Sequence, residues 1–157
     1  MVLEIIVWVD CCFIIMQLDI KEQSLILEGK KYSRKELMSL SANATGDNTS
    51  SFLLDLYRFL ADWFSDSPFM TVHTSGSTGT PKVLTVRKEQ MMQSARMTCE
   101  FLNLHTGDTA LLCMPLQYIA GKMMVVRALV AGLNLILRTP SGHPLADVTV
   151  PLRFVAM

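Results

Sequence analysis

The nine residues from Thr74 to Lys82, TSGSTGTPK, constrain the fold more than any other stretch of the chain. Its two glycines permit backbone conformations and close approaches that other residues resist. Pro81 and the apolar residues 83–86 that follow favour a loop joining two strands over the start of a helix. We therefore expect residues 69–73 to form the strand that enters this loop.

The same stretch has the chemistry of a polyphosphate site. Inward-facing backbone N–H groups form a concave anion site, and hydroxyls and an ammonium group supply further donors. It is not a Walker A motif, because Thr80 and Pro81 separate Gly79 from Lys82. The alternative is that such residues are simply common in loops, but their order favours the phosphate site. The candidate phosphate-binding residues are Thr74, Ser75, Gly76, Ser77, Thr78, Gly79, Thr80 and Lys82.

Residues Thr74–Leu84, TSGSTGTPKVL, resemble the phosphate-binding signature of the adenylate-forming, or AMP-binding, superfamily of acyl-CoA synthetases, peptide-synthetase adenylation domains and luciferases. There the loop holds the β- and γ-phosphates of ATP while a carboxylate attacks the α-phosphorus, and a thiol then captures the acyl-adenylate. The resemblance implies ATP, Mg²⁺ and coenzyme A as cofactors and a small carboxylic acid as partner. It gives Lys82 a phosphate-binding role, distinct from the catalytic lysine of the superfamily.

Residues Pro115–Lys122, PLQYIAGK, resemble a second landmark of acyl-CoA synthetases, Pro-Leu-aromatic-His-x-x-Gly, which lines the acid pocket. Tyr118 stands where the histidine is expected and Gln117 where the aromatic residue is expected. A cation in the first turn of a helix is unfavourable, so we hypothesise that Lys122 contacts a carboxylate of an acidic substrate. The alternative is that its ammonium simply reaches solvent. The resemblance implies Tyr118, Gly121 and Lys122 as substrate-binding residues.

Residues 109–137 are most similar to the o-succinylbenzoate–CoA ligases of menaquinone biosynthesis. This similarity implies an acid–thiol ligase acting on o-succinylbenzoate. Two alternatives stay open. One is another adenylate-forming enzyme, either a general acyl-CoA synthetase or a peptide-synthetase adenylation domain. The other is a non-catalytic fragment that binds phosphate.

Several parts that the superfamily needs do not occur before Met157, including the adenine-binding segment and the small C-terminal domain with the catalytic lysine. We therefore expect residues 16–157 to be part of the N-terminal AMP-binding domain, with no catalytic residue and no activity in the isolated chain. Residues 1–15 are almost wholly apolar but too short to span a bilayer. They are interpreted as a strand or as an extension preceding a natural start at Met16.

Hydrophobic periodicity predicts an α/β fold. The strand–helix–strand order within residues 109–137 implies a right-handed crossover and a mostly parallel sheet. Ser33 and Glu36 form a predicted capping box, and Gly132 is expected to end a helix. The expected strands are 24–27 and 32–33 around a turn at 28–31, then 109–114 and 133–137. The expected helices start at Arg34, cover 52–64 and 87–102, and end at Ala131.

The core is expected to lie under two helical stripes. Arg127 interrupts an otherwise apolar helix and is expected to reach solvent along its aliphatic stem. The predicted inward residues are Leu53, Leu56, Tyr57, Leu60 and Trp63 on helix 52–64, and Met91, Ala95, Cys99 and Leu102 on helix 87–102.

The composition is apolar for a single domain of 157 residues, with 50% hydrophobic and 18% charged residues. A parallel sheet buried on both faces would explain this, and so would an apolar face that a larger fold or self-association covers. The formal net charge is zero, which gives no electrostatic basis for binding nucleic acid or an anionic membrane.

Cysteine and histidine spacing predicts no metal site. The four cysteines, at positions 11, 12, 99 and 113, form no CxxC pair, and the three histidines are far apart. Buried thiols in the reducing cytoplasm are the expected state. His73 lies beside the phosphate loop, but a hydrogen-bonded strand histidine is the favoured interpretation, and no catalytic role is assigned to it.

Overall fold

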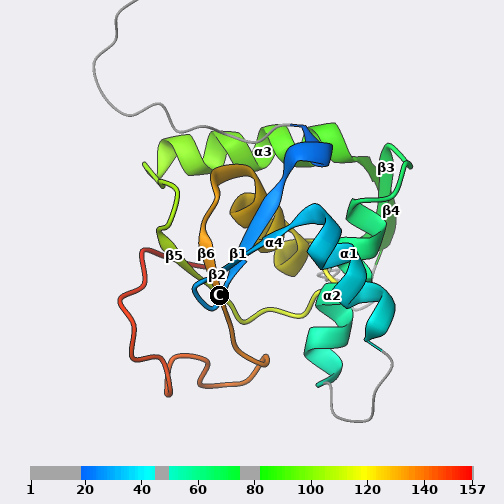
Figure 1. The fold of residues 1–157 in the computed structure, drawn as a ribbon. Coiled ribbons are helices and arrows are strands. Elements are labelled where there is room, and N and C mark those ends of the chain that lie inside the picture. The colour runs from blue at the N-terminus through cyan, green and yellow to red at the C-terminus, as the bar shows by residue number, and fades with distance from the viewer. Residues whose placement is uncertain (1–18, 45–49, 75–81, 157) are drawn as a thin grey trace, which may run out of the picture.

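The computed structural model of the chain describes residues 19–44, 50–74 and 82–156. Helices and strands alternate through most of it (Figure 1). In chain order the elements are η1 (Ile20–Glu22), β1 (Ser24–Leu27), β2 (Lys30–Ser33), α1 (Arg34–Asn43), α2 (Ser51–Trp63), β3 (Phe69–Thr74), β4 (Lys82–Arg87), α3 (Lys88–Phe101), β5 (Thr109–Leu112), α4 (Ile119–Ala131), β6 (Asn134–Leu137) and β7 (Phe154–Val155).

The central sheet is mostly parallel, as the sequence predicts. Its strand order is β2-β1-β6-β5-β7, and within it only the β1–β2 pair is antiparallel. Strands β5 and β6 are adjacent and parallel and are joined through α4, which is the predicted crossover unit. Strands β3 and β4 form a separate antiparallel pair. The sequence did not indicate this separation.

The two faces of the sheet are covered differently. Helix α4 packs against β1, β5 and β6 on one face, and α3 packs on α4. On the other face Leu111, Cys113 and Ile136 pack against Val148 and Leu152 of the irregular C-terminal segment and against Val155 of β7. The alternating directions of strand side chains separate these two sets. Burial of both faces accounts for part of the apolar composition.

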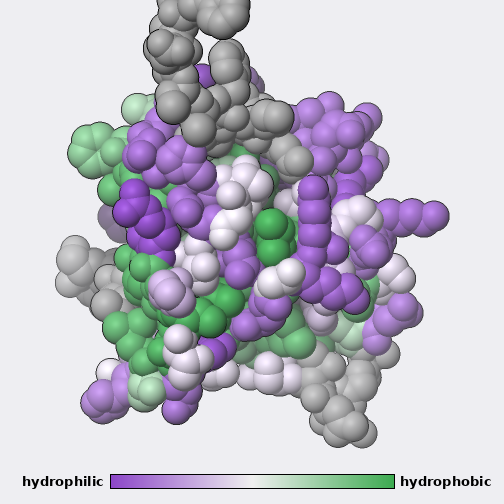
Figure 2. Space-filling view, turned by 60° about the vertical axis from the view of Figure 1, so that its left-hand side comes forward, coloured by the Kyte–Doolittle hydropathy of each residue, from purple (hydrophilic) through white to green (hydrophobic). Residues whose placement is uncertain are grey.

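The surface is not uniformly polar. Figure 2 shows a face on which hydrophobic residues gather on the left and lower parts, whereas hydrophilic residues dominate the right. Among the exposed large hydrophobic residues, Phe101, Met97 and Val83 are 89%, 70% and 61% exposed. The core therefore accounts for only part of the apolar residues, and others lie on the surface.

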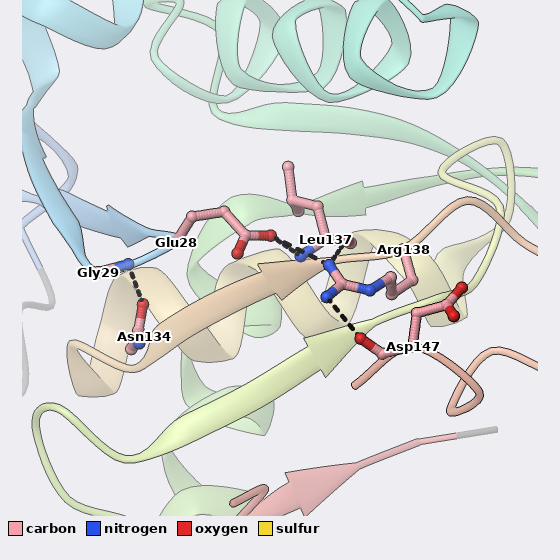
Figure 3. A network of polar contacts seen from close by, with 6 residues as sticks. All are labelled: Glu28, Gly29, Asn134, Leu137, Arg138 and Asp147. Carbon is pink, nitrogen blue, oxygen red and sulfur yellow. Dashed lines mark hydrogen bonds and ion pairs between the residues drawn. The ribbon is translucent and has the colours of Figure 1, made fainter. Parts of the chain in front are cut away.

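The turn between β1 and β2 is tied to β6 by a polar network (Figure 3). Glu28 and Gly29 both have positive φ, 47° and 81°, as in the type I′ turns of two-residue hairpins. The Glu28 carboxylate accepts the Leu137 N–H at 2.8 Å and lies 3.5 Å from the Arg138 guanidinium. The Gly29 N–H donates to the Asn134 amide oxygen at 2.8 Å. The network therefore fixes the β1–β2 hairpin against both ends of β6.

The predicted start of α1 and the predicted end of α4 are both confirmed. Ser33 and Glu36 form the predicted capping box at the start of α1. Gly132 ends α4 in the left-handed conformation, with φ 68°. The helix expected over 52–64 is α2, whose fully buried face also includes Phe52 and Phe59, while Leu53 and Tyr57 are partly buried.

One core prediction was wrong. Leu102 is 37% exposed because α3 ends at Phe101, and Leu104 turns inward in its place. Arg127 is partly exposed, so the expectation that it reaches solvent is met only in part. Its guanidinium lies 5.8 Å from the ring centroid of Phe154, and its Nε is buried without a hydrogen-bond partner in the described residues. The C-terminal segment that covers this part of α4 was not foreseen as a covering layer.

Candidate functional site

The predicted phosphate loop is carried by the β3–β4 hairpin. Cross-strand pairs run from Phe69–Arg87 at the base to Thr74–Lys82 at the far end. The flanks therefore agree with a loop between two strands. Six of the candidate phosphate-binding residues lie outside the described part of the chain: Ser75, Gly76, Ser77, Thr78, Gly79 and Thr80.

Thr74 and Lys82 are the two described members of the phosphate loop. They face each other across the end of the hairpin, with Thr74 partly buried and Lys82 exposed. No carboxylate of the described residues forms an ion pair with the Lys82 ammonium. A hydroxyl and an unpaired ammonium at the open end of a hairpin are suited to an anionic group.

The second landmark lies directly beside this hairpin. Residues 113–117 leave the carboxyl end of β5, and Tyr118 is the N-cap of α4. His73 of β3 forms a parallel backbone bridge with Tyr118. The two segments, 45 positions apart in the sequence, are thus neighbours one residue before the phosphate loop begins. Sequence reasoning named both segments but gave no signal for this bridge.

At Gly121 the first turn of α4 packs directly against the main chain of Met114 and Pro115, which follow β5. A Cβ built on it would lie 2.5 Å from the Pro115 carbonyl oxygen and 2.9 Å from that of Met114. Both atoms belong to the main chain, so a side chain cannot be accommodated without moving the backbone. A glycine here holds the Tyr118 turn tightly on the first turn of α4.

Lys122 lies in that same first turn and points toward the hairpin. Its Nζ donates to the Thr71 carbonyl oxygen of β3 at 2.7 Å. Burial lowers the pKa of Lys122, while the Asp62 carboxylate acts in the opposite direction. One ammonium hydrogen is used in this bond and two stay available to a ligand. The side chain is partly buried, so it does not simply extend into solvent.

His73 has an unremarkable environment for a strand residue. It is partly buried and pairs with Val83 across the hairpin. Its backbone, and not its ring, makes the bridge to Tyr118. Nothing in this arrangement assigns the imidazole a chemical task.

Comparison with known proteins identifies the family. The family model described as AMP-binding enzyme matches residues 9–155. The chain belongs to this family. A search among curated proteins found no match.

Two solved structures are similar to this AMP-binding chain. The first is an acyl-CoA synthetase (AMP-forming)/AMP-acid ligase II-like protein from Dyadobacter fermentans, with 34% sequence identity and a TM-score of 0.67. The match covers 80% of this chain and 35% of that protein. The second is the inhibitor-bound N-terminal domain of FACL13 from Mycobacterium tuberculosis, with 20% identity, a TM-score of 0.44, and coverage of 55% and 25%. The chain thus spans about a third of the length of the first protein.

The described residues of the AMP-binding chain differ in how they fit the expected cofactors. The hairpin end presents a hydroxyl, on Thr74, and an ammonium, on Lys82, which are groups that can bind phosphate oxygens. Within the same residues, no group of three His, Cys, Asp or Glu side chains could hold a metal ion. No helix in the described ranges is long and apolar enough to cross a bilayer.

Proposed function

We propose that this chain is the phosphate-binding part of an ATP-dependent acid–CoA ligase. The observation that carries the proposal is the placement of Tyr118, at the start of α4, beside the hairpin whose far end presents Thr74 and Lys82. A nucleotide phosphate group and an acid bound at these two segments would be neighbours. Such positioning, with electrostatic stabilisation, is the main contribution a protein makes to phosphoryl-type transfer.

The proposed roles follow the two segments. On the phosphate side, backbone and hydroxyl donors and the Lys82 ammonium bind the terminal phosphates: Thr74, Ser75, Gly76, Ser77, Thr78, Gly79, Thr80 and Lys82. On the acid side, Tyr118 lines the pocket, Gly121 keeps the turn close to α4, and Lys122 offers its two remaining hydrogens to a carboxylate. When bound, ATP supplies the leaving group, with Mg²⁺ accompanying its phosphates and coenzyme A as the final acceptor. No catalytic residue is assigned to this chain.

We propose o-succinylbenzoate, the acid used in menaquinone biosynthesis, as the substrate. It carries two carboxylates, one to be activated and one free to meet a cation. Lys122 suits the second role, because it is not paired with a carboxylate in the described residues and lies next to Tyr118. The competing proposal is another adenylate-forming enzyme, for which a second carboxylate would bring no advantage.

We place this chemistry in the cytoplasm. Cys99 and Cys113 are free and buried, which suits a reducing compartment. We also propose that residues 16–157 form part of the AMP-binding domain.

Nucleotide binding is tested by titrating the chain with ATP. We expect Lys82→Met to weaken ATP binding by at least about tenfold, because a charge-assisted bond of about 1.5–3 kcal/mol is lost. Lys35→Met, at an exposed lysine of α1, is the matched control and should leave the affinity unchanged. Equal affinities for both variants, or no ATP binding by the wild type, would refute the proposed function.

Substrate identity is tested separately by binding of o-succinylbenzoate and of benzoate. We expect Lys122→Met to weaken o-succinylbenzoate binding several-fold more than benzoate binding, because only the former has a second carboxylate. If the wild type binds both acids equally, the o-succinylbenzoate proposal is wrong and the general acyl-CoA synthetase is favoured. Pyrophosphate exchange by the full-length protein over a panel of acids, including o-succinylbenzoate, provides the activity measurement.

A further inference from the structure

Lys88 is a buried lysine at the base of the phosphate-loop hairpin. It is the first residue of α3, directly after β4, and is 2% exposed. Among the buried residues of the described chain it is the one charged side chain. A lysine is almost never fully buried without a partner, because removing its charge from water is costly. Its partners therefore indicate its role.

The partners of Lys88 all belong to the segment that leads into β3. The Nζ donates to the carbonyl oxygen of Ser65 at 2.9 Å and to its hydroxyl at 3.2 Å. The backbone N–H of Lys88 donates to the Pro68 carbonyl oxygen at 2.9 Å. One residue thus closes the base of the hairpin with its main chain and its side chain, just outside the Phe69–Arg87 pair.

Electrostatics explain why a cation is tolerated there. The first turn of α3 disfavours a positive charge, but Ser65 lies just beyond the end of α2, where unpaired carbonyls carry partial negative charge. No carboxylate of the described residues is within ion-pair distance of Lys88. Burial lowers the pKa of Lys88, whereas Asp62 and Asp66 oppose this shift from a distance. The ammonium therefore joins the end of α2 to the start of α3 across the hairpin base.

Strand β3 is also held by the Lys122–Thr71 bond and the His73–Tyr118 bridge, whereas Lys88 holds the base of the hairpin and the start of β4. Two-stranded hairpins are marginal on their own, and five of the six residues of β4 are exposed: Lys82, Val83, Leu84, Thr85 and Arg87. Six cross-strand pairs run from its base to its far end. At 3.3–3.4 Å per residue the hairpin is about 17 Å long, so a tilt of about 10° at the base would move Thr74 and Lys82 by about 3 Å. Shifts of this size are large compared with the precision that positioned catalysis requires.

We propose that Lys88 is a positioning residue that sets the orientation of the β3–β4 hairpin, and through it the place of Thr74 and Lys82 relative to Tyr118. The part that concerns nucleotide rests on the proposed function. Lys88 itself lies at the end of the hairpin opposite to Thr74 and Lys82 and touches neither.

The test compares amide hydrogen exchange and ATP affinity in Lys88→Met, which keeps an apolar stem but removes the ammonium. We expect exchange in β3 and β4 to accelerate at least about fivefold, while α4, β5 and β6 keep their protection, and ATP affinity to fall by a similar factor. Lys88→Arg, which retains the charge, should restore much of both. Lys35→Met is the exposed-lysine control.

Two results would overturn the inference. One is unchanged exchange in β3 and β4 of Lys88→Met. The other is a uniform loss of protection across all elements, which would indicate a general stability role. If Lys88→Met does not fold, exchange is measured in Lys88→Arg and in Ser65→Ala instead. Ser65→Ala removes only the hydroxyl acceptor of Lys88, and a local or a uniform change in its protection then distinguishes positioning from general stability. The exchange result stands even if the wild type binds no ATP, so the inference and the proposed function fail separately.

Discussion

At the scale of single residues, the site depends on contacts to the main chain. Gly121 abuts two carbonyl oxygens, and Lys122 and Lys88 each bind a carbonyl oxygen of the segment around β3. Gly121 and Lys122 were singled out from the sequence as candidate site residues. Their partners were not, because Thr71 is 51 positions from Lys122 and no local pattern links them. Lys88 was missed altogether, since a lysine after a strand normally indicates a solvated surface.

Gly121→Ala should destabilise the protein. The new Cβ would meet main-chain oxygens at 2.5 and 2.9 Å, so the strand exit or α4 must shift. Overpacking of this kind costs about 1–3 kcal/mol, and for a domain of this size each kcal/mol lowers Tm by about 2–4 °C. The control is Gly142→Ala, where a Cβ meets nothing within 4 Å. If thermal melts give both variants the Tm of the wild type, the prediction is wrong and the Tyr118 turn can move without a measurable loss of stability.

At the scale of elements, the sequence predicted correctly those helix ends that are determined by neighbouring residues. The capping box of α1 and the glycine end of α4 were both read from the sequence. Strand β7 was not, because two residues paired with β5 leave no periodic signal. The separation of β3–β4 from the main sheet also escaped prediction, since the sequence of a strand does not specify its neighbours.

Ser33→Ala should weaken the start of α1 by about 1 kcal/mol, the usual loss for an N-cap serine. It should also change how stability depends on pH. The Ser33 hydroxyl and N–H donate to the Glu36 carboxylate, both at 2.7 Å, and these bonds lower the pKa of Glu36. Stabilisation from a lowered carboxylate pKa is present above the unfolded value of about 4.3 and is lost as pH falls through the native value.

The variant retains only the backbone donor, so its pKa shift should be smaller. Its deficit relative to the wild type should therefore shrink as the pH is lowered from 6 to below about 4. Urea unfolding at several pH values measures this. Ser33→Thr, which keeps a hydroxyl, should follow the wild type. A deficit that stays constant over the whole range would mean that the Glu36 bond does not depend on the Ser33 hydroxyl.

At the scale of the whole molecule, the apolar composition is explained in two parts. The parallel strands are buried by α4 on one face and by the C-terminal segment on the other, as expected of such a sheet. Apolar side chains also stay exposed, among them Met97 and Phe101, which are one helical turn apart on α3. We propose that such side chains lead the chain to associate with a second copy of itself. Oligomeric state leaves no signature in the sequence beyond this excess of apolar residues.

Phe101→Glu with Met97→Glu should reduce this self-association without lowering stability. The two side chains are 89% and 70% exposed, so replacing them leaves no cavity in the core. The added charges remove apolar surface from the interface and introduce repulsion between copies. Sedimentation velocity over a range of concentrations measures the change, with Gln93→Glu on the same exposed face of α3 as a control for charge alone. If the double variant associates as strongly as the wild type, the contact lies elsewhere, and the exposed strand β4, with Val83 61% and Leu84 45% exposed, becomes the next surface to substitute.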